Sequence, residues 1–208
     1  TPYSSAMLPL GWVQSGNIIT LTHPSTDPRE LVFSALTTWV LRTISTAPSI
    51  TAPTGAAGTP AGGGAFTYRY QVTAAASETY EESLASNIAT VAATLEPTPT
   101  SPIVLTWNAV AGAVEYYVYC DPYGNGVYGF VGTAASNSFR DTGFIADFNL
   151  TPPIARVLFG TSSNFPTCSA YYQQRRFFAN THVEPDTIWG SRIGFTSHFG
   201  ITSPLQDD

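Results

Sequence analysis

The chain has 208 residues, of which 11% are charged and 13% aromatic, and its formal net charge is −6. All eight basic residues are arginine, since the sequence contains no lysine. Such a composition favours strands and turns over helices and excludes a generic polyanion-binding surface. The length allows one large β domain or two ordinary domains.

The two cysteines, Cys120 and Cys168, lack the spacing of a zinc site. One disulfide and two free buried thiols both remain open, and the size of the chain favours free thiols. The longest apolar stretches have the length of strands, so we expect no transmembrane helix. The chain starts at Thr1 without an initiator methionine and ends at residues 206–208 without the end of a folded element, so we expect a fragment.

The first segment, residues 1–49, predicts an antiparallel meander of three strands. Apolar and polar residues alternate in 17–22, 30–34 and 38–44. Residues 23–28 contain two prolines and predict the first turn.

A second segment, residues 50–152, begins in a low-complexity run over 47–65 that predicts a linker or a long exposed connection. Residues 66–74 alternate strictly and give the clearest strand. Residues 83–95 fit both a strand and a helix, and their β-branched residues favour the strand. Further short strands at even spacing predict a β-sandwich; they are residues 103–107, 114–119 and 127–132.

The third segment, residues 153–208, predicts a β-hairpin. A strand over 170–179, a loop over 180–186 and a neighbouring strand over 187–192 follow one another. The first and third segments therefore have similar predicted architecture, and one domain interrupted by the middle segment is a further possibility.

The middle segment resembles a fibronectin type III module in residues 104–113 and 115–119, which are similar to its Trp strand and Tyr strand. The resemblance implies an immunoglobulin/fibronectin III-like sandwich with Trp107, Tyr117 and Tyr70 in its core. Residues 68–74 with 81–86 are similar to the last hairpin of that family, yet here they precede the Trp strand.

The flanking segments resemble the tail tubular protein B, or tail nozzle, family of podoviruses (short-tailed bacteriophages). Residues 165–181 and 185–192 carry the resemblance in the third segment, and residues 12–24 and 28–31 carry it in the first. The motif residues that we expect to be structural are Gln173, Gln174, Arg175, Arg176, Trp189, Ser191, Arg192, His23, Pro24 and Trp39.

The resemblance implies an all-β protein in which the sandwich is inserted between antiparallel, β-propeller-like strand segments. It implies a non-catalytic structural protein of the virion tail that forms a homo-oligomeric ring with adaptor, portal and tail-fibre partners. Double-stranded genome DNA would pass through the ring without specific binding. An alternative from another class is a fibronectin-like binding or adhesive module of a secreted carbohydrate-active protein.

The residues that could carry chemistry have plainer structural interpretations, and we predict no catalytic residue, metal or cofactor. Tandem arginines on a strand point to opposite faces, so at most one of Arg175 and Arg176 could meet a phosphate. Three histidines lack ligand spacing with the nearby aspartates and are expected at the surface or in turns; they are His23, His182 and His198.

Acidic and aromatic side chains permit three further hypotheses. Asp121, Asp141 and Asp147 lie near glycine-rich turns, where turn capping explains them better than calcium binding. The carboxylate pairs at 81–82 and 207–208 are expected to be solvated rather than placed across a glycosidase cleft. Core packing is favoured over a sugar-binding platform for half of the aromatic residues Tyr123, Tyr128 and Phe130.

Overall fold

The computed structural model describes residues 2–59, 64, 66–93, 96–156, 158–159 and 164–202. These residues form fourteen strands and one short 3-10 helix, η1 (Ser5–Met7), and all strand pairs are antiparallel. The prediction of an all-β protein is confirmed. Among the described residues, no helix is long and apolar enough to cross a membrane.

The chain divides into two compact units. Unit 1 combines Thr1–Ala47 with Arg156–Gly200, and unit 2 contains Pro48–Ala155 with the described residues Ile201 and Thr202. Residues from two separate parts of the chain therefore build unit 1, and the middle of the chain builds most of unit 2.

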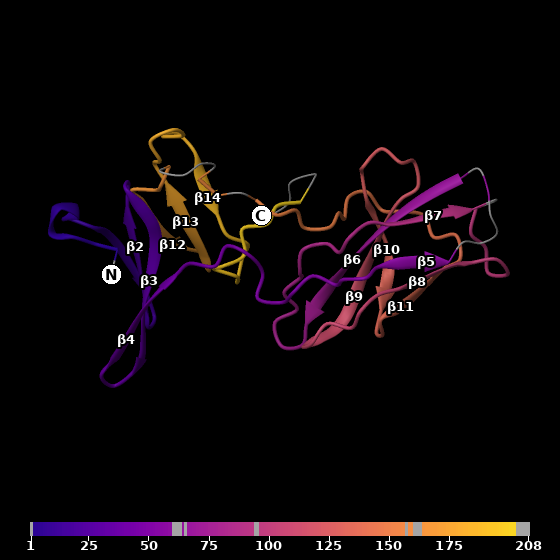
Figure 1. The fold of residues 1–208 in the computed structure, drawn as a ribbon, viewed down its shortest axis with the longest axis horizontal. Helices are drawn as coiled ribbons and strands as arrows, with labels where there is room; N and C mark the ends of the chain where they lie inside the picture. Colours follow the sequence, from indigo (N-terminus) through magenta and orange to yellow (C-terminus); the bar gives the residue numbers. More distant parts are fainter. Residues whose placement is uncertain are drawn as a thin grey trace. The chain divides into compact units, whose positions relative to one another are not determined.

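The N-terminal part of unit 1 is a four-stranded meander in the order β1-β2-β3-β4 (Figure 1). The expected three strands are present, and an additional strand, β1, precedes them. The predicted turn over 23–28 is too long, because Thr26 already pairs with His23. Pro28 fits in β3 since it lies beside a bulge and beyond the last pair with β4. The strands are β1 (Gly11–Ser15), β2 (Ile18–His23), β3 (Thr26–Ala35) and β4 (Thr38–Thr43).

The C-terminal part of unit 1 is a three-stranded sheet in the order β12-β13-β14, and β12 lies against β1 and β2. The single strand predicted over 170–179 is wrong, because a two-residue turn interrupts it. Gln173 and Gln174 occupy that turn with φ of 47° and 61°, positions where glycine or asparagine is usual. The strands are β12 (Cys168–Tyr172), β13 (Arg175–Ala179) and β14 (Ile188–Gly190).

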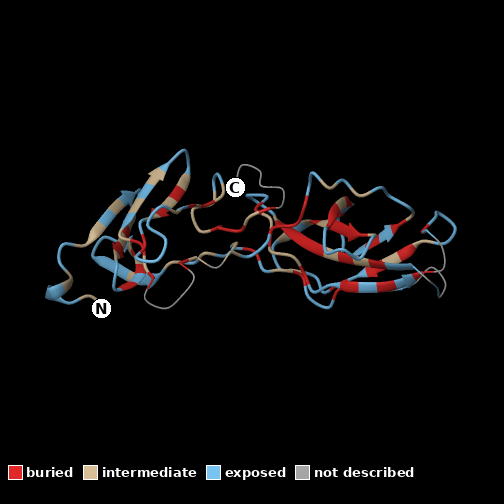
Figure 2. Ribbon diagram, turned by 90° about the horizontal axis from the view of Figure 1, so that it is seen from above, coloured by how far each residue is buried: buried red, intermediate tan, exposed pale blue. Residues whose placement is uncertain are grey.

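Unit 2 consists of two sheets that enclose one hydrophobic core. A four-stranded sheet has the order β10-β9-β6-β7, and a three-stranded sheet has the order β11-β8-β5. Figure 2 shows many buried residues in these strands; burial alternates along β7, β8 and β11, whereas β6 and β9 each contain a run of four buried residues. The strands are β5 (Ala57–Thr59), β6 (Phe66–Ala76), β7 (Ala89–Ala93), β8 (Ile103–Thr106), β9 (Ala113–Asp121), β10 (Gly129–Ala134) and β11 (Ser138–Asp141).

Two of the three residues predicted for the core of unit 2 lie in it. Tyr70 and Trp107 are buried in it, but Tyr117 is not. Tyr116 takes the core position and packs edge-on against Trp107 at a centroid distance of 5.3 Å. Because strand side chains alternate, burying Tyr116, Val118 and Cys120 places Tyr117 on the other face.

Two further expectations about the middle segment, the linker over 47–65 and the strand over 83–95, are only partly correct. The run over 47–65 is not entirely a linker, because it contains β5 and the buried Ile50; residues 60–63 and 65 lie outside the described residues. In the ambiguous stretch 83–95, the strand β7 begins only at Ala89, and residues 94–95 lie outside the described residues. Before it, the hydroxyls of Ser83 and Ser86 accept hydrogen bonds from backbone N–H groups of β6.

Both cysteines are free thiols; Cys120 is buried, but Cys168 is exposed, contrary to the expectation of two buried thiols. Burial raises the pKa of Cys120 to about 12, and the carboxylates of Asp141 and Asp121 contribute to this rise. The thiolate is the reactive form, so Cys120 stays unreactive in the folded protein.

We predict that one thiol per chain reacts with a disulfide reagent at pH 8, and that the second reacts only after unfolding in denaturant. Absorbance of the released thiolate measures both steps. Cys168→Ser should remove the fast step and leave the slow one unchanged. Two fast thiols in the native wild-type protein would contradict the burial of Cys120.

Candidate functional site

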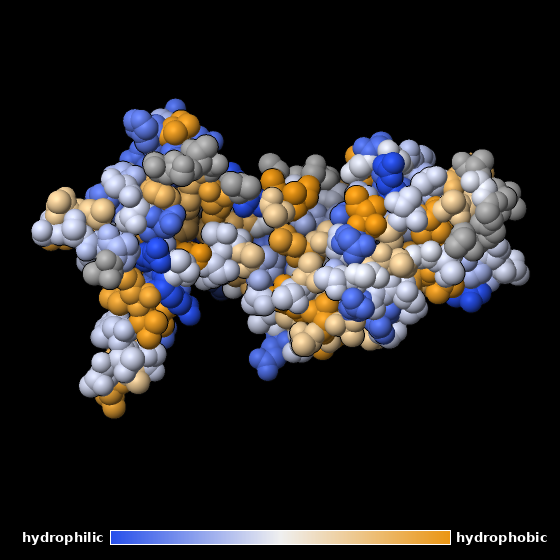
Figure 3. All heavy atoms as spheres, in the orientation of Figure 1, coloured by the Kyte–Doolittle hydropathy of each residue, from blue (hydrophilic) through white to orange (hydrophobic). Residues whose placement is uncertain are grey.

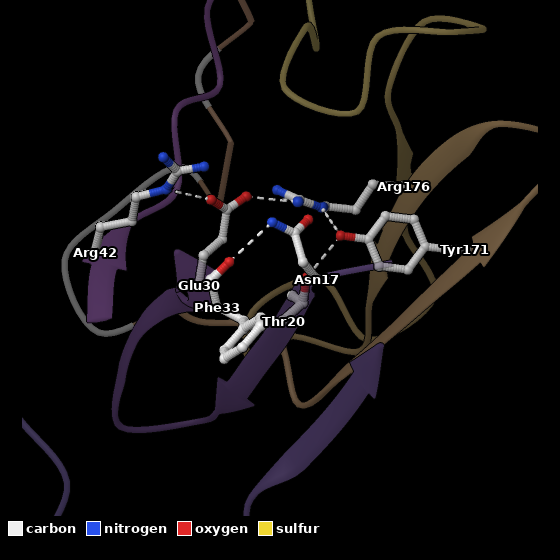
Figure 4. Close-up of polar contacts among 7 residues, drawn as sticks. All are labelled: Asn17, Thr20, Glu30, Phe33, Arg42, Tyr171 and Arg176. Carbon is white, nitrogen blue, oxygen red and sulfur yellow. Dashed lines mark hydrogen bonds and ion pairs between the residues drawn. The ribbon is translucent and has the colours of Figure 1, made fainter. Parts of the chain in front are cut away.

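The motif residues of the two ends of the chain meet at a buried ion pair in unit 1. Arg176 on β13 donates from Nη2 to Glu30 Oε1 on β3 at 2.6 Å (Figure 4). Both side chains are almost completely buried. This contact therefore links Thr1–Ala47 directly to Arg156–Gly200.

The ion pair belongs to a wider polar network (Figure 4). Arg176 Nε donates to the Tyr171 hydroxyl at 2.9 Å, and that hydroxyl also hydrogen-bonds Thr20 Oγ1 at 2.9 Å. The Tyr171 ring lies 5.3 Å from the guanidinium carbon. Arg42 Nε donates to Glu30 Oε2 at 2.7 Å. Side chains from five strands are thus tied together, and each carboxylate oxygen of Glu30 receives one guanidinium.

The energetic role of the pair is to fix one arrangement of the two sheets. Nη1 of Arg176 is buried without a hydrogen-bond partner among the described residues, so the charge is not fully compensated. A buried pair of this kind contributes little net stability compared with apolar packing, but removing one partner leaves an uncompensated charge. Misaligned packing of β3 and β13 is therefore strongly disfavoured.

The neighbouring Arg175 points away from this network, as expected for tandem arginines on a strand. Its Nε donates to the Ser191 carbonyl, and its guanidinium lies over the Phe177 ring at 5.4 Å. Ser191 Oγ accepts the backbone N–H of Arg176 at 2.9 Å. Hydrogen bonds therefore join the motif around 173–176 to the motif around 189–192.

The other motif residues have separate places in unit 1. Trp189 is buried in an aromatic cluster, 5.4 Å from Phe159 between ring centroids. The Arg192 backbone donates to the His198 carbonyl. His23 Nδ1 accepts the N–H of Ser25 at 3.1 Å across the turn that contains Pro24.

Trp39 lies on the hairpin of β3 and β4, where its half-exposed ring packs on Phe33 at a centroid distance of 5.1 Å. Leu36 at the tip and Val40 on β4 are also exposed. Figure 3 shows hydrophobic surface on this hairpin. Since β4 is at the edge of its sheet, the hairpin presents unpaired backbone groups together with apolar side chains.

The residues considered for other chemistry have structural partners. Asp121 and Asp141 cap backbone N–H groups of the turns that follow them, as predicted. No group of three or more metal-ligating side chains occurs in the part of the chain that the structure describes. His198 lies in a turn, as expected, since its N–H donates to the Phe195 carbonyl, but it is buried rather than at the surface. Its Nδ1 accepts the N–H of Gly200.

The carboxylate pair at 81–82 is not simply solvated, contrary to expectation. Glu81 is buried and accepts the hydroxyl and the N–H of Ser49. Glu82 accepts the hydroxyls of Thr73 and Tyr119 at 2.6 Å each. Both carboxylates hold loops and strands of unit 2 together; residues 207–208 lie outside the described residues.

The three aromatic residues considered for a sugar-binding platform differ in burial and in packing. Tyr128 is buried, and Phe130 packs edge-on against Tyr117 and Tyr119. Tyr123 is exposed and stacks on Phe148.

No protein-family model matches the chain, and no curated protein matches it either.

We predict that Arg176→Met destabilises unit 1 by about 3–5 kcal/mol, because Glu30 loses its buried partner. The matched change Arg42→Met should cost less than about 1 kcal/mol, since Arg42 is more than half exposed. Native-state amide exchange of β3 and β13 measures both effects, and the amides of β6 and β9 in unit 2 provide the internal reference. Equal losses in the two variants would contradict the assigned role of Arg176.

Proposed function

We propose that this chain is a non-catalytic structural component of a short bacteriophage tail, of the nozzle type that its motifs resemble. The proposal rests on one observation above all. The two motif segments that carry the resemblance, separated by the whole of unit 2, pack into unit 1 through Glu30 and Arg176. Motifs that belong to one family domain are expected to meet in this way.

The form of unit 1 supports the propeller-like part of the proposal. A β-propeller is built from four-stranded antiparallel blades, and β1-β2-β3-β4 is a four-stranded antiparallel meander. In the proposed parent protein this sheet would be one blade, and β12-β13-β14 would belong to the neighbouring blade.

We further propose that unit 2 is a fibronectin III-like sandwich whose last hairpin has moved to the front. In that family the Tyr strand pairs with the penultimate strand of the module, and the last strand lies beside it. Here β9 pairs with β6, and β6 pairs with β7, so this hairpin occupies that place although it precedes the Trp strand, β8. A circular permutation of the family order accounts for this arrangement.

A tyrosine contact supports the same interpretation. Immunoglobulin-like sandwiches have a tyrosine whose hydroxyl bonds to the chain just upstream, at the corner between two strands. In unit 2 the buried Tyr70 donates to Asp141 Oδ2 at 2.7 Å. Asp141 ends β11, which would directly precede the Tyr70 strand in the family order. In this proposal the Tyr70–Asp141 contact, made to a carboxylate rather than to the backbone, takes the place of the corner contact, although the covalent connection differs.

The arginine contacts favour a conduit without specific DNA binding. Arg42 and Arg176 share Glu30, Arg69 lies 3.9 Å from Asp121, and Arg175 donates to a backbone carbonyl. Arg140 also donates to a backbone carbonyl, that of Pro99. With these five of the eight arginines engaged and a net charge of −6, a continuous basic track for phosphates is disfavoured. DNA would slide past such a surface rather than be held by it.

We predict that the full-length parent protein forms closed rings with a central channel wide enough for duplex DNA. Negative-stain electron microscopy of the purified protein, alone and with adaptor and portal proteins, tests this directly. A persistent monomer under both conditions would contradict the tail-conduit function.

A variant pair extends the same experiment to the exposed hairpin. Val40→Lys places a charge on the edge strand β4 and should reduce ring formation without unfolding unit 1. Leu150→Lys alters a residue of unit 2 that is equally exposed, at 45%, and should leave ring formation unchanged.

A further inference from the structure

Unit 2 contains a cavity of about 330 Å³ beside the start of β6 and the loops that follow β9 and β11. This volume is at the lower end of the range of roughly 300–1,000 Å³ for small-molecule sites. The residues that matter for its chemistry are Tyr68, Glu96, Tyr123, Asp141, Phe144 and Phe148.

Aromatic rings form an open platform in this cavity. The rings of Tyr123 and Phe148 are stacked, with centroids 6.3 Å apart and planes at 25°. Tyr123 is 76% exposed, and Phe144 is 51% exposed. Their exposed ring faces are therefore available to a ligand that has an apolar face.

Buried carboxylates hold the loops that carry these rings. Asp121 accepts the backbone N–H groups of four residues in the loop of Tyr123, with distances between 2.7 and 3.3 Å. Asp141 accepts the N–H groups of Gly143 and Phe144 as well as the Tyr70 hydroxyl. The platform is therefore organised before any ligand arrives, which lowers the entropic cost of binding.

Hydrogen-bonding groups lie beside the platform. Burial raises the pKa of Tyr68 above its ordinary value, and the carboxylates of Glu96 and Asp141 contribute, so its hydroxyl remains a donor at neutral pH. Glu96 supplies an exposed carboxylate. The described residues that line the cavity include the carboxylates of Glu96 and Asp141 but no arginine or histidine, so the lining itself opposes anionic ligands. The guanidinium of Arg69 lies outside the lining, where it donates to the Gly124 carbonyl and lies 3.9 Å from Asp121.

We propose that this cavity binds a neutral or amino-bearing sugar, whose apolar ring face stacks on Tyr123 and whose hydroxyls bond to Glu96 and Tyr68. A sugar ring has both an apolar face and a dense set of donors, which the flat platform and the carboxylate match. A quaternary ammonium ion would need aromatic rings enclosing it, whereas Tyr123 and Phe148 are stacked on each other. The inference concerns unit 2 alone and does not depend on the proposed tail function.

Saturation-transfer NMR on the full chain tests the proposal with a defined panel. The probes are glucose, galactose, N-acetylglucosamine, glucosamine and their disaccharides, with sialic acid as the acidic counterpart and choline as the ammonium probe. We expect transfer to at least one neutral or amino sugar and none to sialic acid. Absence of transfer to every neutral and amino sugar, or transfer to choline alone, would overturn the proposal.

Substitutions in the cavity test whether the saturation transfer arises from a sugar bound there. Tyr123→Ala should weaken binding of the sugar by about tenfold, a change of about 1.4 kcal/mol. Tyr172→Ala removes a tyrosine of unit 1 that is 66% exposed and should have no effect. Thermal unfolding of each variant verifies that unit 2 remains folded. Undiminished binding by a folded Tyr123→Ala protein would place the sugar elsewhere and overturn the proposal.

Glu96→Gln separates the contribution of the Glu96 charge to sugar binding from the contribution of stacking on Tyr123. The amide keeps a hydrogen-bond acceptor but loses the charge, so neutral sugars should still bind while the repulsion of sialic acid is relieved. Complete loss of neutral-sugar binding in this variant, with Tyr123→Ala unaffected, would contradict stacking on Tyr123 as the main interaction.

Discussion

A buried carboxylate is strongly destabilising unless a buried cation pairs with it. Glu30 and Arg176 form such a pair although 146 positions separate them in the sequence. Their contact determines which surfaces of β3 and β13 face each other, and Tyr171, Thr20 and Arg42 extend this constraint to the adjacent strands. The aromatic cluster around Trp189 supplies apolar burial in the same unit. Unit 1 is therefore specified by polar geometry as much as by its hydrophobic packing.

Unit 2 differs from unit 1, because almost all of it comes from one stretch, Pro48–Ala155, with a single large core; only Ile201 and Thr202 join it from the C-terminal part of the described chain. Thr46 and Arg156, next to the two ends of that stretch, line the same cavity in unit 1. An insertion that leaves and returns at one place disturbs its host little. This separation is compatible with our two proposals, in which unit 1 would take part in tail assembly and unit 2 would bind a sugar at its loops.

The sequence predicts a strand well where apolar and polar residues alternate strictly, as in 66–74. It predicts poorly where a strand ends because the backbone adopts an unusual conformation. The turn at Gln173 and Gln174 lacks the glycine or asparagine that would indicate it, so β12 and β13 were expected to be one strand. Two adjacent tyrosines at 116 and 117 carry no information about which one faces the core, and the register of β9 decides this. The Glu30–Arg176 pair and the cavity of unit 2 join residues far apart in sequence, so only the three-dimensional structure identifies them.

Thr1–Ala47 and Arg156–Gly200 form one folding unit, which Pro48–Ala155 interrupts in the sequence. The most direct test replaces residues 48–155 by a short Gly-Ser linker and measures amide exchange in the remaining protein by NMR. The account predicts dispersed resonances and protected amides in both β3 and β13, because Glu30 and Arg176 still meet. A collapsed spectrum with unprotected amides in these strands would contradict it, since unit 1 would then need unit 2 in order to fold.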